Sequence, residues 1–373
     1  MAASFHDLGD RWLLANRDGS FTVWKQIAAG DGGRVVGPGY LGRMELADGT
    51  VVCDGFVEPN VSCNDPHFQG LAAFAWHHYR DLPDEPEIWN RGWELRCFME
   101  CGDDPFGVRQ ARAVVPPYVN AAGQVRLSVA LDFVDRYSDR EGKRVMEARY
   151  DYIVEDSCIR LWVTATQQPD GTDSGPRPFV KEPKLALGLG GATYRPNSLD
   201  VLDAESTLLR AIDLINEPRL QNPRKGTVQI HFDMRTRLRF SDGTRVLDVV
   251  GRASETPTYG SDGRPTDYGA RHSWEGAPFG FDRWASLANA RDEFAPEPCR
   301  PYCKQGRGRG GEPGLTRQWE LAKFGDEPYT EIMLHAWEGG SGLPDCLCCA
   351  KAFAPGERHT AFLSLSAGAG FAL

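Results

Sequence analysis

The sequence has no long apolar run and no excess of positive charge. None of its segments approaches the roughly 20 consecutive apolar residues that cross a bilayer. The net charge of −10 argues against a nucleic-acid or anionic-membrane surface, because both require basic patches. The one basic stretch, Lys304–Gly311, is explained more simply as a Gly/Arg surface loop. We expect a small-molecule or glycan substrate and neither a nucleic-acid nor a membrane partner, and the composition leaves the oligomeric state open.

Several catalytic signatures are also missing from the sequence. It contains no phosphate-cradling G-x-x-x-x-G-K-[ST] loop, no H-E-x-x-H zinc helix and no G-x-S-x-G nucleophile elbow. These gaps argue against P-loop nucleotide enzymes, zinc peptidases of that type and α/β-hydrolases. We expect the protein to require no cofactor.

The first fifteen residues do not resemble a secretory signal. Asp7, Asp10 and Arg11 interrupt the apolar residues, and there is neither a basic start nor a continuous apolar core. This predicts a cytoplasmic location. The ten cysteines and the glycosylation acceptor triplet Asn60–Ser62 leave secretion open as the alternative.

Strand patterns are far more frequent than helical ones. Gly (41), Pro (25) and Trp (10) are abundant, which favours turns and short strands. Period-2 alternation between turn residues predicts strands at Phe21–Trp24, Gln124–Val134, Val145–Val154, Cys158–Thr166, Thr227–Phe240, Arg245–Val250, Gln318–Phe324, Tyr329–Trp337 and His359–Ser366. Helical spacing predicts short helices over Phe68–Tyr79, Asp203–Ile215 and Asp282–Phe294, with Asp203 as an N-cap.

The predicted fold class is therefore mostly β. We expect a large antiparallel β-sandwich, or two packed β-sandwich or barrel subdomains, with a few short helices. A stretch rich in Pro, Gly and Asp at 169–183 predicts a linker or long loop. It would divide an N-terminal β subdomain at 1–168 from a C-terminal β subdomain at 184–373, and one continuous β domain is the alternative.

Two segments, His272–Gly276 and His335–Gly339, share the pattern H-x-W-E-G. Histidine exchanges protons near neutral pH, and a glutamate in apolar surroundings can act as an acid. Tryptophan offers a flat face on which sugar rings stack. The predicted catalytic residues are His272, Glu275, His335 and Glu338, and the predicted substrate-binding residues are Trp274, Trp337 and Trp76. The alternative is a core Trp, a hydrogen-bonded His and an exposed Glu in each segment, and the sequence does not place the segments side by side.

Four cysteines form a second candidate site. Cys299 and Cys303 make a C-x3-C pair, and Cys346 and Cys349 belong to a C-x-C-C group. They could hold a structural zinc, form disulfides or remain free buried thiols, because neither spacing is the usual C-x2-C knuckle. The cysteines elsewhere in strand-like or aromatic sequence, such as Cys53 and Cys158, are expected to be small core residues.

Three functions fit these features. The first is an acid-base enzyme on a carbohydrate, namely a hydrolase, lyase or epimerase. The second is an isomerase or cyclase that acts on an apolar small molecule in a pocket between two β subdomains. The third is a non-catalytic binding protein. The sequence alone determines neither the substrate nor the reaction.

Overall fold

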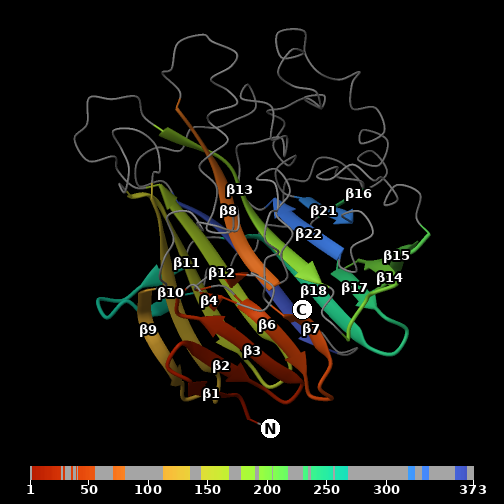
Figure 1. Ribbon diagram of the computed structural model, residues 1–373, viewed down its shortest axis with the longest axis horizontal. Coiled ribbons are helices and arrows are strands. Elements are labelled where there is room, and N and C mark those ends of the chain that lie inside the picture. Colours follow the sequence, from red (N-terminus) through yellow and green to blue (C-terminus); the bar gives the residue numbers. More distant parts are fainter. Residues whose placement is uncertain are drawn as a thin grey trace.

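The fold is built from antiparallel strands, as the computed structural model shows (Figure 1). The structure describes residues 2–26, 28–29, 35–36, 39, 41–54, 70–79, 112–134, 144–167, 178–189, 193–203, 205–216, 230–233, 237–254, 257–267, 318–323, 330–335 and 358–367. These residues contain strands and turns and no helix. Consequently, no helix long and apolar enough to cross a membrane is found among them.

Ten strands form the first sheet, in the order β1-β2-β3-β6-β8-β13-β22-β21-β16, with β7 paired to β6. Its strands are β1 (Ser4–Asp7), β2 (Arg11–Ala15), β3 (Gly19–Trp24), β6 (Leu41–Leu46), β7 (Val51–Asp54), β8 (Gly70–Tyr79), β13 (Pro178–Leu189), β16 (Ile230–Asp233), β21 (Gln318–Lys323) and β22 (Thr330–His335).

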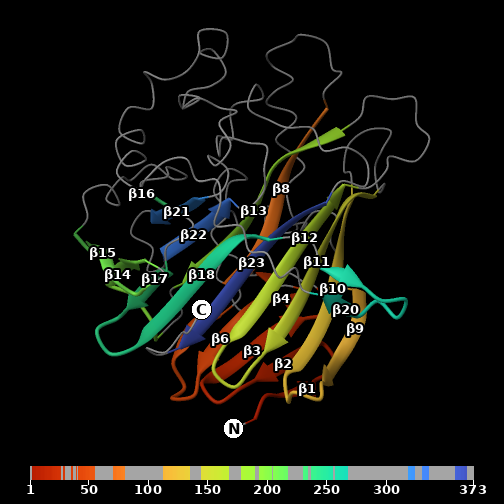
Figure 2. The same ribbon diagram turned by 180° about the vertical axis from the view of Figure 1, so that it is seen from behind.

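Nine strands form the second sheet, in the order β15-β14-β17-β18-β23-β12-β11-β10-β9. They are β9 (Arg112–Val119), β10 (Val125–Val134), β11 (Arg144–Val154), β12 (Ile159–Gln167), β14 (Ser198–Leu202), β15 (Leu208–Asp213), β17 (Arg237–Ser241), β18 (Val246–Ser254) and β23 (Arg358–Ala367). Two small sheets pair β4 (Ala28–Ala29) with β5 (Val35–Val36), and β19 (Thr258–Tyr259) with β20 (Pro265–Asp267). Figure 2 shows the nine-stranded sheet from its outer side.

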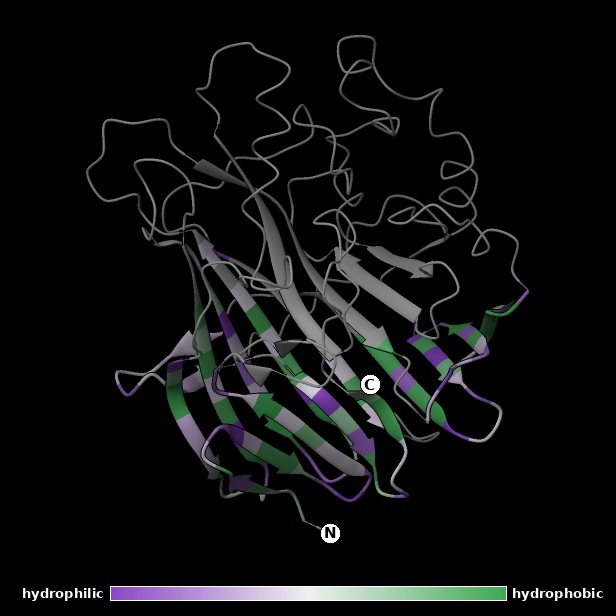
Figure 3. Cartoon of the chain, in the orientation of Figure 1, coloured by the Kyte–Doolittle hydropathy of each residue, from purple (hydrophilic) through white to green (hydrophobic). Residues whose placement is uncertain are grey.

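The core lies between the two large sheets. Trp12 and Leu14 alternate with half-exposed residues along β2. On β11 of the other sheet, Tyr150 and Tyr152 are buried, and so is Asp151 between them. Figure 3 shows this alternation of hydrophobic and hydrophilic residues along the strands. Each large apolar side chain buried in this way contributes about 1.5–3 kcal/mol relative to an exposed one. The period-2 pattern in the sequence is therefore the pattern of one buried and one outward face.

Most of the predicted strands are confirmed. The pair Val145–Val154 and Cys158–Thr166 is the hairpin β11–β12, and Gln318–Phe324 and Tyr329–Trp337 contain the hairpin β21–β22. The last predicted strand, His359–Ser366, is β23. Cys53 and Cys158 are buried, as expected of small core residues.

Two of the predicted helices are wrong. Phe68–Tyr79 contains β8, which lies between β6 and β13, so its long apolar run belongs to a strand inside a sheet. Asp203–Ile215 contains a turn and the strand β15. The Asp203 carboxylate does accept a backbone N–H, from Thr207 at 2.7 Å, but it closes the turn from β14 to β15 and caps no helix. The third predicted helix, Asp282–Phe294, lies outside the described residues.

The sequence predicted a single strand at Thr227–Phe240, and this prediction is wrong. The segment holds β16, at the edge of the ten-stranded sheet, and β17, in the nine-stranded sheet. Likewise, β13 begins at Pro178, within the segment predicted as a linker, and continues to Leu189. Each large sheet takes strands from both sides of that segment.

Candidate acid-base site on the ten-stranded sheet

Only two of the predicted catalytic and substrate-binding residues lie in the described part of the chain. His335 is the last residue of β22, and Trp76 lies on β8. His272, Trp274, Glu275, Trp337 and Glu338 lie outside the described residues, and so do Cys299, Cys303, Cys346 and Cys349. The predictions of a two-segment site and of a zinc or disulfide cluster therefore remain predictions.

The strand register places further acid-base residues beside His335. On the neighbouring strand β21, Gln318 is directly opposite His335, and Asp233 on β16 is opposite Gln318. The next row on the same face contains Met333, Glu320 and His231, in that order across the three strands. Figure 1 shows β22, β21 and β16 side by side. Residues two apart on a strand share a face, and so do directly opposed residues on neighbouring strands. These two rows therefore belong to one face of the ten-stranded sheet.

That face is directed away from the core. The row next to Met333, Glu320 and His231 is apolar. It consists of Leu41, Leu71, Leu187, Ile332, Leu321 and Ile230, which are aligned across six strands. Leu41 is fully buried, which identifies its row as the core side. Because successive residues alternate between faces, Glu320 and His335 occupy the outer side of the sheet.

The strand register sets the spacing of these positions along the sheet. Directly opposed residues of an antiparallel pair have Cβ atoms about 4.5–5.5 Å apart, and diagonal neighbours are about 7–8 Å apart. Glu320 and His231 are directly opposed, whereas Glu320 and His335 are diagonal neighbours.

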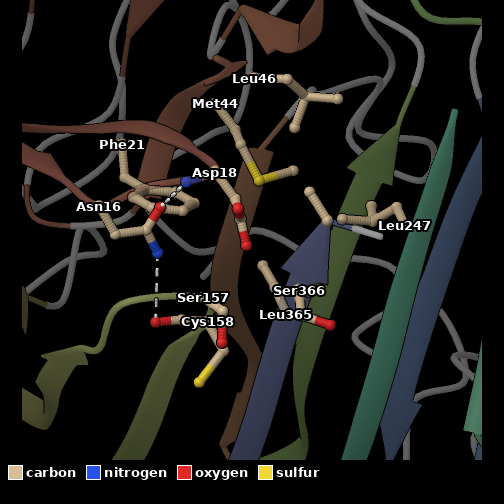
Figure 4. A pocket seen from close by; sticks show the side chains of 11 residues that line it. Asn16, Asp18, Phe21, Met44, Leu46, Ser157, Cys158, Leu247, Leu365 and Ser366 are labelled. Carbon is tan, nitrogen blue, oxygen red and sulfur yellow. Dashed lines mark hydrogen bonds between the residues drawn. The ribbon is translucent and has the colours of Figure 1, made fainter. Parts of the chain in front are cut away.

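A second candidate location is an opening of about 240 Å³, open solvent included, at the hairpin tips (Figure 4). Its lining includes Asn16, Asp18 and Cys158. The Asp18 carboxylate accepts from Arg17 Nε at 3.0 Å, and the Asn16 side-chain oxygen accepts from the backbone N–H groups of Asp18 and Gly19. Burial raises the pKa of Cys158 to about 12, with the Glu155 carboxylate adding to the effect, so the thiol stays neutral. These polar groups hold the turn together, and the lining contains no acid-base pair.

Two further buried polar groups, the Asp248 carboxylate and the Tyr194 hydroxyl, belong to the core and not to an acid-base site. Arg239 on β17 donates to both oxygens of Asp248 on β18, at 2.8 and 2.9 Å, and the Asp248 side chain is fully buried. The Tyr194 hydroxyl has no hydrogen-bond partner among the described residues. Burial raises the pKa of Tyr194, and the negative charges of Asp242 and Asp248 raise it further. In the described part of the chain, no group of three or more His, Cys, Asp or Glu side chains is arranged to hold a metal ion.

No family model matches the chain, and no curated protein matches it. Among solved structures, the chain is similar to a galactose mutarotase-like protein from Lactobacillus casei, with 9% identity and a TM-score of 0.43, over 96% of this chain and 100% of that one. It is also similar to a galactose mutarotase-like protein from Clostridium acetobutylicum, with 8% identity and a TM-score of 0.40, over 98% of both chains.

Sequence reasoning missed Glu320, His231, Gln318 and Asp233. Alternation within each strand is visible in the sequence, so the faces of Glu320 and His231 within their own strands could have been assigned. The pairing of β16 with β21 could not, because the two strands are far apart in the chain and no turn connects them. The site consequently depends on sheet topology rather than on a local motif.

Proposed function

We propose that the protein is a carbohydrate-active enzyme that uses His/Glu acid-base chemistry, and that its reaction is an epimerisation at the anomeric carbon of an aldose. One observation carries the proposal: the register of β22, β21 and β16 puts His335, Glu320 and His231 on one outer face of the sheet. The galactose mutarotase-like proteins above share this substrate class by name. We rest the proposal on the register and not on that likeness.

In this proposal Glu320 and His335 act on opposite sides of the anomeric centre. One of them takes the proton of the anomeric hydroxyl while the other gives a proton to the ring oxygen. The bond between the anomeric carbon and the ring oxygen breaks, and the open-chain aldehyde forms. Rotation about the adjacent carbon-carbon bond and reversal of the two proton transfers give the other anomer. Every proton is returned, so the reaction needs neither an oxidant nor a cofactor.

The two histidines of the two rows are the feature that favours epimerisation, although the rows also hold the diagonal carboxylic pair Glu320 and Asp233. A glycosidase needs two carboxylic groups about 5–5.5 or 6.5–9.5 Å apart. Here the residues that flank Glu320, directly or diagonally, include two histidines, which exchange protons near neutral pH. Trp76, together with the predicted Trp274 and Trp337, would supply aromatic faces for stacking, and His272, Glu275 and Glu338 remain further candidates for proton transfer.

Polarimetry on the full-length protein tests this proposal. Freshly dissolved single anomers of common aldohexoses and aldopentoses are mixed with the protein, and the approach to the equilibrium rotation is compared with the spontaneous rate. We expect acceleration for at least one aldose. A thermal-shift series with the same sugars and with apolar polycyclic compounds runs alongside, because a ligand at 100 times its dissociation constant adds about 2.7 kcal/mol of stability. Shifts confined to the apolar compounds, without acceleration, would instead favour the isomerase or cyclase.

A further inference from the structure

A buried carboxylate joins the β19–β20 hairpin to the outer side of the nine-stranded sheet. Asp151 on β11 has a side chain that is 1% exposed. It accepts a hydrogen bond from the Tyr259 hydroxyl at 2.7 Å, one from Arg149 Nε at 3.1 Å and one from the Ser128 hydroxyl. Tyr259 belongs to β19, whereas the other two donors belong to the sheet. A single carboxylate thus connects β10, β11 and the hairpin.

Arg149 makes the second link between sheet and hairpin. Its guanidinium lies over the Tyr259 ring, 3.7 Å from the ring centroid, and donates to the Gly263 carbonyl at 2.7 Å. Further out, the Arg264 guanidinium lies 4.5 Å from the centroid of the Tyr118 ring on β9. The contacts that include a buried charge therefore gather at Arg149 and Asp151, and the outer contact is a surface cation-π pair.

The hairpin has little to hold it together without the sheet. Its register consists of Thr258 opposite Asp267 and Tyr259 opposite Pro265, and the turn is closed by the Gly260 amide donating to the Arg264 carbonyl at 2.8 Å. A two-stranded hairpin alone in water is marginally stable at best. Its exposed residues, such as Asp262 and Thr266, bury no apolar surface within the hairpin. Its order consequently depends on docking.

We propose that residues 258–267 form a strap that docks on the nine-stranded sheet and opens from it as one unit, with Asp151 as its latch. Figure 2 shows β20 lying outside β10 and β11, away from the core between the sheets. Opening would break the contacts to Asp151 and Arg149 and leave the sheet's own ladders intact. The strap ends five residues before His272 in the sequence.

The Asp151 carboxylate is buried and accepts three hydrogen bonds. Burial raises the pKa of Asp151, and the Arg149 charge and the hydrogen bonds from Ser128, Tyr259 and Arg149 oppose that effect. Burial also raises the pKa of Tyr259, with the nearby Asp151 charge adding to it, so the phenol remains a donor at neutral pH. Hydrogen bonds to a charged group contribute more than those between neutral groups. Removing the phenol hydroxyl should therefore weaken docking without changing the sheet.

Hydrogen exchange followed by mass spectrometry tests this proposal on the full-length protein. In Tyr259→Phe we expect peptides covering Gly260–Asp267 to exchange about tenfold to a hundredfold faster than in the wild type, which is the factor that one lost hydrogen bond to a charged acceptor implies. Peptides from β10, β11 and β12 should keep their wild-type rates. The matched control is Tyr118→Phe, which removes a hydroxyl under the same strap without touching Asp151, and it should leave the strap rates unchanged.

Two results would overturn the proposal. Unchanged exchange in the strap of Tyr259→Phe would show that Asp151 is not the latch. Equal acceleration in the strap and in β10–β12 would show that the hairpin opens only with the whole sheet. Exchange of the wild type in low denaturant gives the same decision without a mutation, because an independent strap must exchange by a faster route than the β10–β12 amides. None of these measurements depends on the proposed enzyme activity.

Discussion

Glu320 on β21 and His231 on β16 are directly opposite each other in the ten-stranded sheet, and His335 lies diagonally across from Glu320 on β22. β16 is the edge strand of this sheet, so the pair lies at its lateral end. Three residues from three separate stretches of sequence thus share a small area of one face. This relationship leads to the proposed proton transfer on a sugar.

The buried hydroxyls of Tyr194 and Tyr152 should respond differently to removal. Tyr194→Phe removes a buried hydroxyl without a hydrogen-bond partner in the described part of the chain, and the folded state should gain up to about 1 kcal/mol or remain unchanged. Tyr152→Phe removes a hydroxyl that donates to the Gly39 carbonyl at 3.0 Å, and it should lose about 0.5–1.5 kcal/mol. Urea unfolding of both variants measures the difference. A larger loss for Tyr194→Phe would show that its hydroxyl has a partner.

Acid should weaken the contact between the turns of the two sheets. Hydrogen bonds from Thr50 and Arg245 lower the pKa of Asp48 from 3.8 to about 2, and Arg245 Nε lies 2.8 Å from the Asp48 carboxylate. A lowered pKa in the folded state means that this stabilisation is complete above the unfolded value of 3.8 and is lost as the pH falls towards 2.

Melting temperatures between pH 6 and pH 2 check this expectation. The wild type should lose more stability across the range than Asp48→Asn, which has no carboxylate to protonate at that position. Identical pH dependence of the two proteins would mean that the Asp48 contact does not form in solution.

The ion pair of Arg239 and Asp248 should contribute far more than an exposed pair. Asp248→Ala removes a buried carboxylate and leaves the part-buried Arg239 without its bidentate partner, which should cost about 1.5–3 kcal/mol. The control is Asp10→Ala, which breaks the contact with Arg11 between side chains 45% and 37% exposed, and it should change stability by less than about 1 kcal/mol. Denaturant unfolding midpoints of both variants measure the two losses of stability. Equal losses in Asp248→Ala and Asp10→Ala would contradict the burial of Asp248.

The fold class was predictable because alternation is local. The β11–β12 and β21–β22 hairpins follow from strand patterns joined by short turns, and both are present. The β8 segment was misread because Leu71, Ala72, Ala75 and Trp76 also satisfy helical spacing, and pairing with β6 and β13 decided the outcome. The Asp203 turn shows the same limit, because one side-chain hydrogen bond serves a cap or a turn equally well.

The candidate site was only partly predictable, for a different reason. His335 stood out in the sequence through its H-x-W-E-G segment. Glu320 carries no motif, but it lies with His335 in the predicted β21–β22 hairpin. His231 joins them only when β16 pairs with β21. Such long-range pairing is set by the whole sheet, whose order is not encoded in any single segment.

Catalysis by Glu320 is the most direct test of the account. Anomer interconversion of the best aldose is measured by polarimetry for the wild type, for Glu320→Gln and for the control Glu45→Gln. The control changes a part-exposed Glu that pairs with Arg43 on β6 of the same sheet. Loss of a general acid-base group should lower kcat by about a hundredfold or more in Glu320→Gln, with KM little changed, while Glu45→Gln keeps wild-type activity. Wild-type kcat in a correctly folded Glu320→Gln protein would contradict the proposed site.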